Sequence, residues 1–527
     1  MDKYKYLLLL FSCIIILLFW SCFPISYDNN DDFVMQGICS GAFSGSPTPN
    51  IVFINFFISK ILHTLYLIYN KVNWYTLYLQ LILFVCFVTT SYLFIKNKYI
   101  NLLISLLFVY FIFFGLYFIC MVKLQFTTVA LFCALTGLLL FINREDKKNN
   151  NVLSALFIIV AFLIRKDTFF ISIAFLLPIL FIEYNKVNAI RKNIKTIIAV
   201  CIVFITCLYV NNNSKEYKES QTYSNFNAID IIAAKPTTLK TNILIENKLS
   251  VDDIILLQHW FMADEAYLTG KKIEHFAKSI KCNRNTIEII SEFKKFATDE
   301  RYILLVYFIT IVFILFFSKK NITFCLLNLS IFLFLLLYLT ITSRIPHRIT
   351  FPIISYLSLA NIFVIFKNNN NSKMQLYLLC LLFVISNYKA YCTSKLYKIQ
   401  TVYHETFKKY THEIKQHPES IFIALETLPI QYNDAWQIPK NIFPAHNVII
   451  NGWYACTPDY QYLLSTKHLT NLTSDLKNRN DILFLTNDST LQRAYINVMK
   501  QRYNINCHFE AVDGFRYLKP QQLVFDN

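Results

Sequence analysis

The stretch YLLLLFSCIIILLFWSCF, residues 6 to 23, is an unbroken apolar run that follows a short basic start at Lys3 and Lys5. A helix of about this length can cross a hydrocarbon core of about 30 Å. A cleaved secretory signal peptide has a similar form, but SCFPIS (21 to 26) offers no small-residue cleavage site. We therefore expect a retained first membrane helix.

The remainder of the chain repeats this pattern. Of its 527 residues, 55% are hydrophobic and 17% aromatic, and it has 8 glycines, which is unlike a soluble domain. The expected fold is mainly α: a polytopic transmembrane helical bundle of about 11 spans over residues 1–390, followed by a small α/β domain over residues 391–527. The expected spans lie near 6–23, 74–95, 99–119, 124–142, 152–164, 168–182, 195–210, 302–318, 322–342, 349–366 and 374–389.

The net charge of +17 is explained by membrane topology. Lysines and arginines cluster in short connectors, as the positive-inside bias requires of cytoplasmic loops, so no nucleic-acid partner is inferred. A cytoplasmic N-terminus places every second connector on that side and the C-terminal domain outside a cytoplasmic (inner) membrane. The connectors assigned to the cytoplasm are 96–98, 144–151, 183–195, 318–321 and 367–373.

Three extramembrane segments then share the outer side. In the outer loop 21–73, an apolar stretch with polar interruptions, 51–69, predicts a helix lying at the membrane interface. The alternative is a twelfth span, which would turn the lysine-rich connectors outward. The segment 211–301 predicts short helices outside the membrane. Beyond residue 417, the runs SIFIALETLPI, NVIINGWYAC, DILFLTN and QQLVF predict strands of the α/β domain.

Acidic residues follow the first span directly, in DNNDD (28–32). A partly desolvated carboxylate near a membrane interface can accept a hydroxyl proton and act as a general base. Asp31 and Asp32 are therefore candidate catalytic residues, and Asp28 is interpreted as a solvated neighbour. The alternative is that DNNDD is only a hydrated turn.

Basic residues on the predicted outer side run against the positive-inside bias. Arg165 with Lys166, and Arg344 with Arg348, are candidates for holding a phosphate, because Arg makes bidentate bonds to phosphate oxygens and Lys adds a point charge. Contact with lipid headgroups explains the same residues equally well. His347, between the two arginines, is a further candidate, although a lone histidine is more often simply interfacial.

Motifs of soluble enzyme chemistry are absent from the sequence. The 14 cysteines include no CxxC pair and no Cys/His spacing of the zinc type, so no metal site is predicted. The sequence also has no P-loop, no GxGxxG after a strand, no GxSxG and no HExxH.

The layout resembles the GT-C superfamily of polytopic membrane glycosyltransferases, which take a sugar from a polyprenyl-phosphate carrier. An acid pair in the first outer loop, an interfacial helix, many spans and an outer C-terminal domain carry the likeness. More narrowly, short stretches resemble bacterial membrane proteins of surface-polysaccharide gene clusters: DDFVMQGICSG (31–41), NWYTLYLQ (73–80), NKLSVDDIILLQHWFMADE (247–265), SRIPHRITFPI (343–353) and INGWYACTPDY (450–460).

The resemblance implies an inverting displacement. Asp31 or Asp32 would deprotonate the hydroxyl of a glycan or lipid-linked acceptor, and cations would stabilise the departing lipid phosphate. By position these cations are Arg165, Lys166, Arg344 and Arg348. Further candidate substrate contacts are His347, Asp252, Asp253, Trp260 and Trp453. Some members of the superfamily need a divalent cation and others do not, so the resemblance implies no fixed cofactor.

Other functional classes fit the same composition. A lipid-linked saccharide flippase is also basic and polytopic, but transporters usually need helices broken in mid-membrane, and this chain has few glycines and prolines within its spans. A polysaccharide polymerase would also act outside on polyprenyl-linked sugars. A structural or scaffolding membrane protein is a further alternative.

Overall fold

The computed structural model describes residues 2–95, 101–142, 147–182, 198, 201–210, 249–261, 286–317, 321–342, 345–368, 372–425, 430, 433–438, 447–470, 472 and 474–526. Arg344 and most of the predicted outer segment 211–301 lie outside these ranges.

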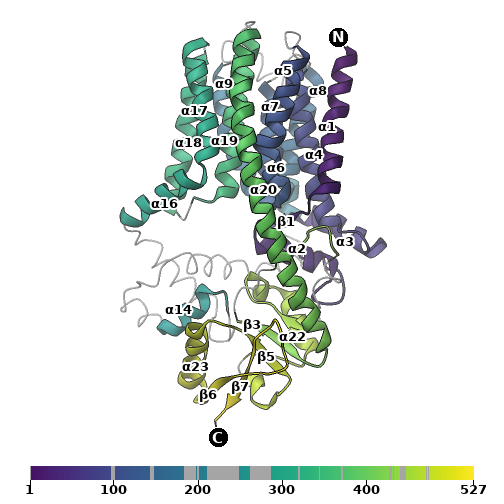
Figure 1. Cartoon of the computed structure of the whole chain (residues 1–527), viewed down its shortest axis with the longest axis vertical. Coiled ribbons are helices and arrows are strands. Elements are labelled where there is room, and N and C mark those ends of the chain that lie inside the picture. Colours follow the sequence, from purple (N-terminus) through teal and green to yellow (C-terminus); the bar gives the residue numbers. More distant parts are fainter. Residues whose placement is uncertain are drawn as a thin grey trace.

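A bundle of long apolar helices forms one end of the molecule (Figure 1), and the chain is a membrane protein. The backbone groups of a helix bond within the helix itself, which is what a segment in lipid requires. The bundle helices are α1 (Asp2–Cys22), α4 (Trp74–Ile95), α5 (Leu102–Tyr110) continued by η1 (Phe111–Tyr117) and α6 (Phe118–Val122), α7 (Phe126–Ile142), α8 (Lys147–Ile164), α9 (Lys166–Ile182), α17 (Arg301–Phe317), α18 (Ile322–Thr342), α19 (His347–Asn368) and the first part of α20 (Ser372–Gln416).

The number of spans can be compared with the prediction only within the described ranges. There, 5 helices are long and apolar enough to cross a membrane, or up to 6 if the bent pair Ile289–Asp299 and Arg301–Phe317 is one span. Shorter apolar helices occupy Tyr6–Cys22, Phe126–Phe141, Asn150–Ile164 and Cys201–Val210, within further predicted spans. The fold is thus a multi-helical membrane bundle, and the count of about 11 stays a prediction.

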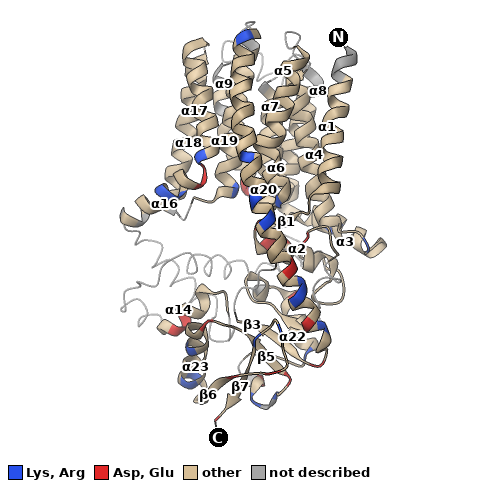
Figure 2. Cartoon of the chain, viewed as in Figure 1, with Lys and Arg blue, Asp and Glu red and all other residues tan. Residues whose placement is uncertain are grey.

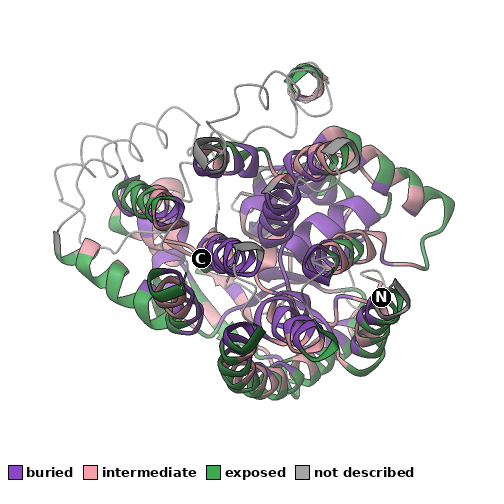
Figure 3. Ribbon diagram, turned by 90° about the horizontal axis from the view of Figure 1, so that it is seen from above, coloured by how far each residue is buried: buried purple, intermediate pink, exposed green. Residues whose placement is uncertain are grey.

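Burial divides the bundle helices into inner and outer ones. Seen along the bundle (Figure 3), buried residues line the interior and exposed residues cover the outer faces. Helix α19 is central, with 94% of its apolar window buried, whereas α18 and α20 have only 28% buried. The exposed apolar side chains of α18, such as Phe334 and Tyr338, therefore form a surface suited to lipid.

Two short helices lie at the end of the bundle opposite the N-terminus (Figure 1). Helix α2 (Asn30–Ser40) follows α1 and is ended by Gly41, whose positive φ of 68° favours glycine. Helix α3 (Phe56–Ile68) lies within the stretch predicted to be interfacial. Its 13 residues extend for about 20 Å, too short to cross the membrane core, which argues against a twelfth span. Strands β1 (Ser26–Tyr27) and β2 (Lys123–Leu124) pair in parallel beside α2.

The C-terminal part contains a 5-stranded sheet in the order β4-β3-β5-β7-β6. Strand β3 is parallel to β4 and β5, and β7 is antiparallel to β5 and β6. Strand β6 lies outside the four predicted β segments. The elements are β3 (Ile421–Ala424), β4 (Val448–Ile449), η4 (Trp453–Cys456), α22 (Pro458–Thr466), η5 (Ser474–Asn478), β5 (Ile482–Leu485), α23 (Ser489–Tyr503), β6 (Cys507–Ala511) and β7 (Pro520–Phe525).

One helix joins the two parts. Helix α20 has 45 residues and is about 68 Å long, so it runs from the bundle into the C-terminal part (Figure 1). Near its end, the buried carboxylate of Glu413 accepts backbone N–H groups of Arg516, Tyr517 and Leu518. Helix α14 (Val251–Gln258) lies beside α23 of the C-terminal part, whereas α16 (Thr286–Asp299) lies at the end of the bundle next to α17 (Figure 1).

The C-terminal part also bonds directly to the start of α4. The carbonyl of Ala435 accepts the hydroxyl of Thr76 at 2.6 Å and the amide of Asn73 at 2.5 Å. The ring of Trp436 packs edge-on against Trp20 of α1. Because these groups are buried or half-buried, the contact fixes the sheet against the bundle end where α2 lies.

Candidate functional site

Asp31 stands where three distant parts of the chain meet. It lies in the first turn of α2, and its Oδ1 accepts the indole N–H of Trp453 at 3.0 Å. Its Oδ2 lies 3.3 Å from Nη1 of Arg348, in the first turn of α19, and accepts the side-chain amide of Asn29 at 3.0 Å. The carboxylate thus joins the first loop, the bundle and the C-terminal part, and 23% of its side chain remains exposed.

Asp32, the next residue, has a different environment. It is fully buried, and its Oδ1 accepts the hydroxyl of Tyr75 at 2.8 Å and the backbone N–H of Phe126 at 3.1 Å. Burial raises the pKa of Asp32 well above its ordinary value, and the charge of Asp31 adds to this, while both hydrogen bonds oppose it. A carboxyl group in this position retains its proton more readily and is closed to an incoming hydroxyl.

Arg165 reaches the same region from the loop between α8 and α9. Its Nη1 donates to the hydroxyl of Thr127 at 2.9 Å, and its guanidinium lies 5.2 Å from the ring centre of Phe126. The next residue, Thr128, donates its hydroxyl to the carbonyl of Arg348 at 3.3 Å. The start of α7 therefore holds both arginines at one end of the bundle.

An aromatic layer lies between Arg165 and Asp31. The ring of Phe53 stacks on Phe126 at 5.6 Å and meets the ring of Trp453 edge-on at 5.1 Å. The guanidinium of Arg165 lies against both phenylalanines, and Trp453 bonds to Asp31. The acid and the two arginines thus surround a common group of rings.

Charged side chains gather at this end of the bundle and are sparse along the bundle helices (Figure 2). Asp28 belongs to this region, and its carboxylate lies 3.4 Å from Nζ of Lys123 on the neighbouring strand β2. Asp28 is thus bonded to β2 rather than to Arg348 or Trp453, and its interpretation as a neighbour of the site stays a prediction.

The other candidates from the SRIPHR stretch and from α9 lie around this centre. His347 bonds through Nδ1 to Oε1 of the buried Glu300 at 2.8 Å, and the hydroxyl of Thr350 donates to the same oxygen. Lys166 is exposed at the first residue of α9. Arg344 lies outside the described residues.

Asp252 and Asp253 lie apart from Asp31 and are engaged within the C-terminal part. Asp253 and Ser250 form a reciprocal cap at the start of α14, with Asp253 Oδ2 accepting the N–H of Ser250 at 2.8 Å. Asp253 also pairs with Arg502 of α23, and Asp252 accepts the amide of Asn497 at 3.2 Å. These contacts fasten α14 to α23.

Trp260 is connected to the site through a backbone hydrogen bond. Its φ is 60°, and its carbonyl accepts the N–H of Gly452 at 3.2 Å. Gly452 directly precedes Trp453, so the end of α14 supports the turn that carries the indole to Asp31.

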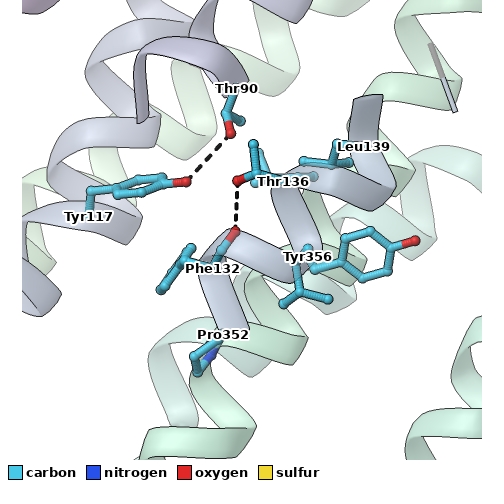
Figure 4. Close-up of a pocket in the computed structure, with 9 residues that line it drawn as sticks. Thr90, Tyr117, Phe132, Thr136, Leu139, Pro352 and Tyr356 are labelled. Carbon is cyan, nitrogen blue, oxygen red and sulfur yellow. Dashed lines mark hydrogen bonds between the residues drawn. The ribbon is translucent and has the colours of Figure 1, made fainter. Parts of the chain in front are cut away.

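A small cavity in the bundle is separate from this site. It is lined by residues of α4, η1, α7 and α19, among them Pro352 and Tyr356 (Figure 4). Its polar groups are hydroxyls, such as that of Tyr117, which lies 3.4 Å from Thr90 Oγ1, and that of Thr136, which donates to the carbonyl of Phe132 at 2.7 Å. No charged residue lines it, so it lacks the acid and cations of the Asp31 site.

Several residues of the site were missed in the sequence. Tyr75 and Thr127 sit at the starts of apolar helices, where one hydroxyl among many apolar residues gives no distinct signal. Glu300 stands directly before an apolar span, and an acid in such a place was a signal that could have been used. Across the described part of the chain, no group of three or more His, Cys, Asp or Glu side chains is arranged to hold a metal ion.

The comparisons with known proteins give likeness in structure alone. Neither a family model nor a curated protein matches the sequence. Two crystal structures of ArnT from Cupriavidus metallidurans are similar over almost the whole length. The apo structure has a TM-score of 0.44 and 9% identity and covers 100% of this chain and 98% of ArnT. The structure bound to undecaprenyl phosphate has a TM-score of 0.40 and 9% identity, with coverages of 99% and 98%.

Proposed function

We propose that this chain is a membrane glycosyltransferase that moves a sugar from a polyprenyl-phosphate donor to a glycan or lipid-linked acceptor. The observation that carries the proposal is the position of Asp31: a partly exposed carboxylate at the end of the bundle, between Arg348 and Trp453. Ionisable side chains near the hydrocarbon core carry a desolvation cost, and they are therefore candidates for a functional site.

The proposed step is a single displacement at the anomeric carbon. Asp31 accepts the proton of the acceptor hydroxyl, and the oxygen forms a bond to the anomeric carbon. The bond from that carbon to the phosphate oxygen breaks, and its electron pair leaves with the polyprenyl phosphate. Attack opposite to the leaving group inverts the configuration at the anomeric carbon.

Arg348 and Arg165 are proposed to stabilise the departing phosphate. One Nη of Arg348 contacts Asp31, and its remaining N–H groups donate to no group in the described part of the chain. Arg therefore has donors left for a phosphate while still touching the base. Arg165 is held on the other side of the aromatic layer by Thr127 through Nη1 and by Asp167 through Nε at 3.3 Å, and its Nη2 is the donor proposed for the phosphate.

Asp31 is a better candidate for the base than Asp32. A base must lie within hydrogen-bond reach of the substrate proton, and Asp32 is fully buried. The hydrogen bonds to Asp32 come from Tyr75 and Phe126, which fix the start of α2 against α4 and α7. We therefore assign Asp32 a positioning role: it holds the turn on which Asp31 stands.

The proposed location follows from the connectors. With the basic connectors in the cytoplasm, the end of the bundle that carries α2, α3 and the sheet faces outward, and the sheet forms an extracytoplasmic domain. The donor would then be used at the outer face of the cytoplasmic membrane.

A saccharide flippase remains the rival function. The feature that favours it is the 77° bend between Ile289–Asp299 and Arg301–Phe317, since transporters use broken helices. The bend, however, lies where α16 leaves the end of the bundle (Figure 1), whereas a transport site is expected near the membrane midplane.

The test is reconstitution of the full-length protein with polyprenyl-phosphate sugars and candidate acceptors. We expect Asp31→Asn to lower the transfer rate about 10² to 10⁴ fold, the usual contribution of a general base. Asp32→Asn should have a smaller effect, because Asn keeps an oxygen for Tyr75 and Phe126. Equal rates for wild type and Asp31→Asn would remove Asp31 as the base. Sugar movement across vesicles without transfer by the wild type would favour the flippase.

A further inference from the structure

A lysine that packs against a ring of α19 was not among the sequence candidates. Lys389 belongs to α20, at the boundary of its predicted span. Its Nζ lies 5.2 Å from the ring centre of Tyr302 and 5.5 Å from that of Phe351, so the ammonium sits between a ring of α17 and a ring of α19.

The charge of Lys389 has no paired anion. Across the described residues, its ammonium makes no hydrogen bond and no ion pair, although the side chain is half-buried. The neighbouring Lys123 differs, since Asp28 lies 3.4 Å from its Nζ. Contacts with ring faces compensate a lysine charge only in part. The ammonium of Lys389 is therefore available to an anionic ligand.

The nearest acid does not supply the anion. Glu300 is within electrostatic range of Lys389, but its Oε1 is occupied by His347 and by the hydroxyl of Thr350. The other oxygen of Glu300, Oε2, is buried without a hydrogen bond, but among the described residues no ion pair joins Glu300 to Lys389.

Lys389 of α20 is connected to the turn of α19 that carries Arg348 through the ring of Phe351. Phe351, whose ring is beside Lys389, follows Arg348 by three positions, so the two side chains share one face of the helix. Across the described residues, Arg348 and Lys389 each have N–H donors left over, and donors of this kind suit a phosphate group with several oxygens.

We propose that Lys389 binds a lipid phosphate at the end of the bundle, next to Arg348. A phosphate at this place has two sources, the polyprenyl carrier and an anionic phospholipid of the bilayer, and both present the same oxygens to the ammonium. In its first form the proposal rests on the proposed glycosyltransferase function and names a further residue that binds the donor phosphate.

The test uses the full-length protein in phosphatidylcholine nanodiscs. Polyprenyl phosphate is added in one arm and phosphatidylglycerol in the other, and lipid occupancy is measured by native mass spectrometry. Lys389→Met is the main variant, because a methionine fills the space between the two rings without a charge. Lys395→Met is the matched control: Lys395 is on the same helix and lies 4.7 Å from the ring centre of Tyr391, but it is exposed.

We expect Lys389→Met to weaken binding of one of the two lipids about tenfold, and Lys389→Arg to retain most of it, since one charge-assisted phosphate contact is lost or kept. Lys395→Met should bind as the wild type does. The arm that responds identifies the source of the phosphate. If Lys389→Met does not fold, Lys389→Gln takes its place.

Two outcomes separate this inference from the proposed function. Unchanged affinity for both lipids in Lys389→Met, with only a lower melting temperature, would overturn the inference and assign Lys389 to the long-range charge balance of Glu300. Failure of the wild type to bind polyprenyl phosphate would reject the proposed function, while the phosphatidylglycerol arm would still test Lys389. Binding lost in Arg348→Gln but kept in Lys389→Met would reject Lys389 alone.

Discussion

Two acid pairs stand in the first turn of a helix in this chain, Asp31–Asp32 in α2 and Asp252–Asp253 in α14. In both places the carboxylates are favoured by the positive end of the helix. Their partners differ. Asp252 and Asp253 bond to Asn497 and Arg502, which both belong to α23, whereas Asp31 bonds to Arg348 of the bundle and to Trp453 of the C-terminal part.

The sequence of an acid pair therefore does not tell its role. The groups that bond to the pair distinguish one that stabilises helix packing from one in a candidate functional site. The α14 pair closes a cap and an ion pair, and the buried Asp253 has little exposure to any ligand. The two residues of the α2 pair differ in exposure: Asp31 is partly exposed, whereas Asp32 is fully buried. The same kind of substitution in the two pairs should therefore have different effects on activity and stability.

The largest contrast is expected for the arginine partners. Arg348→Gln removes the cation beside Asp31 and should lower the transfer rate about 100-fold, the usual effect of losing one donor that stabilises developing charge. Arg502→Gln removes the partner of Asp253 and should lower stability with little change in kcat. Transfer assays and melting curves on both variants make the comparison. Equal losses of kcat would contradict the distinction between the two pairs.

The next effect is on stability. Asp253→Asn keeps an oxygen for the cap with Ser250 but removes the charge that pairs with Arg502, which should cost about 1–3 kcal/mol in the free energy of unfolding. Asp252→Asn is the control, because an asparagine oxygen can still accept the amide of Asn497. Chemical denaturation of the full-length protein measures both. A loss of transfer activity in Asp253→Asn without a loss of stability would place this pair in a second site.

The sequence predicted the kind of fold and part of the site. Long apolar runs predict membrane helices because backbone N–H and C=O groups in lipid must be hydrogen-bonded within the protein, and a helix achieves this within one segment. Asp31, Arg165 and Arg348 could be selected because charges at span boundaries are costly. The division between Asp31 and Asp32 could not be predicted, since it depends on Tyr75 and on the backbone of Phe126, which only the packing of α4 and α7 brings to α2. The pairing of Trp453 with Asp31 depends in the same way on how the sheet docks.

A smaller effect is expected at the indole of Trp453. Trp453→Phe keeps a ring against Phe53 but removes the N–H donated to Asp31. The transfer rate should fall about tenfold, since a hydrogen bond to a charged group contributes at least about 1.5 kcal/mol. Trp436→Phe is the control. It changes a tryptophan at the same contact with the bundle, packed against Trp20 rather than Asp31. Comparable losses in the two variants would show that ring packing matters and the bond to Asp31 does not.

The smallest expected effect is the pH dependence of the melting temperature that is caused by Asp32. Burial raises the pKa of Asp32 in the folded state, so its contribution to stability is full below the unfolded pKa of about 3.9 and is lost as pH rises toward the folded value. Asp32→Asn has no proton to lose there. Its melting temperature relative to wild type should therefore increase by a few degrees as pH rises from about 4 to 8. Asp513→Asn, at an exposed position between β6 and β7, controls for general charge effects. Parallel curves for wild type and Asp32→Asn would show that Asp32 titrates as an ordinary surface acid, and the positioning role argued from its burial would fail.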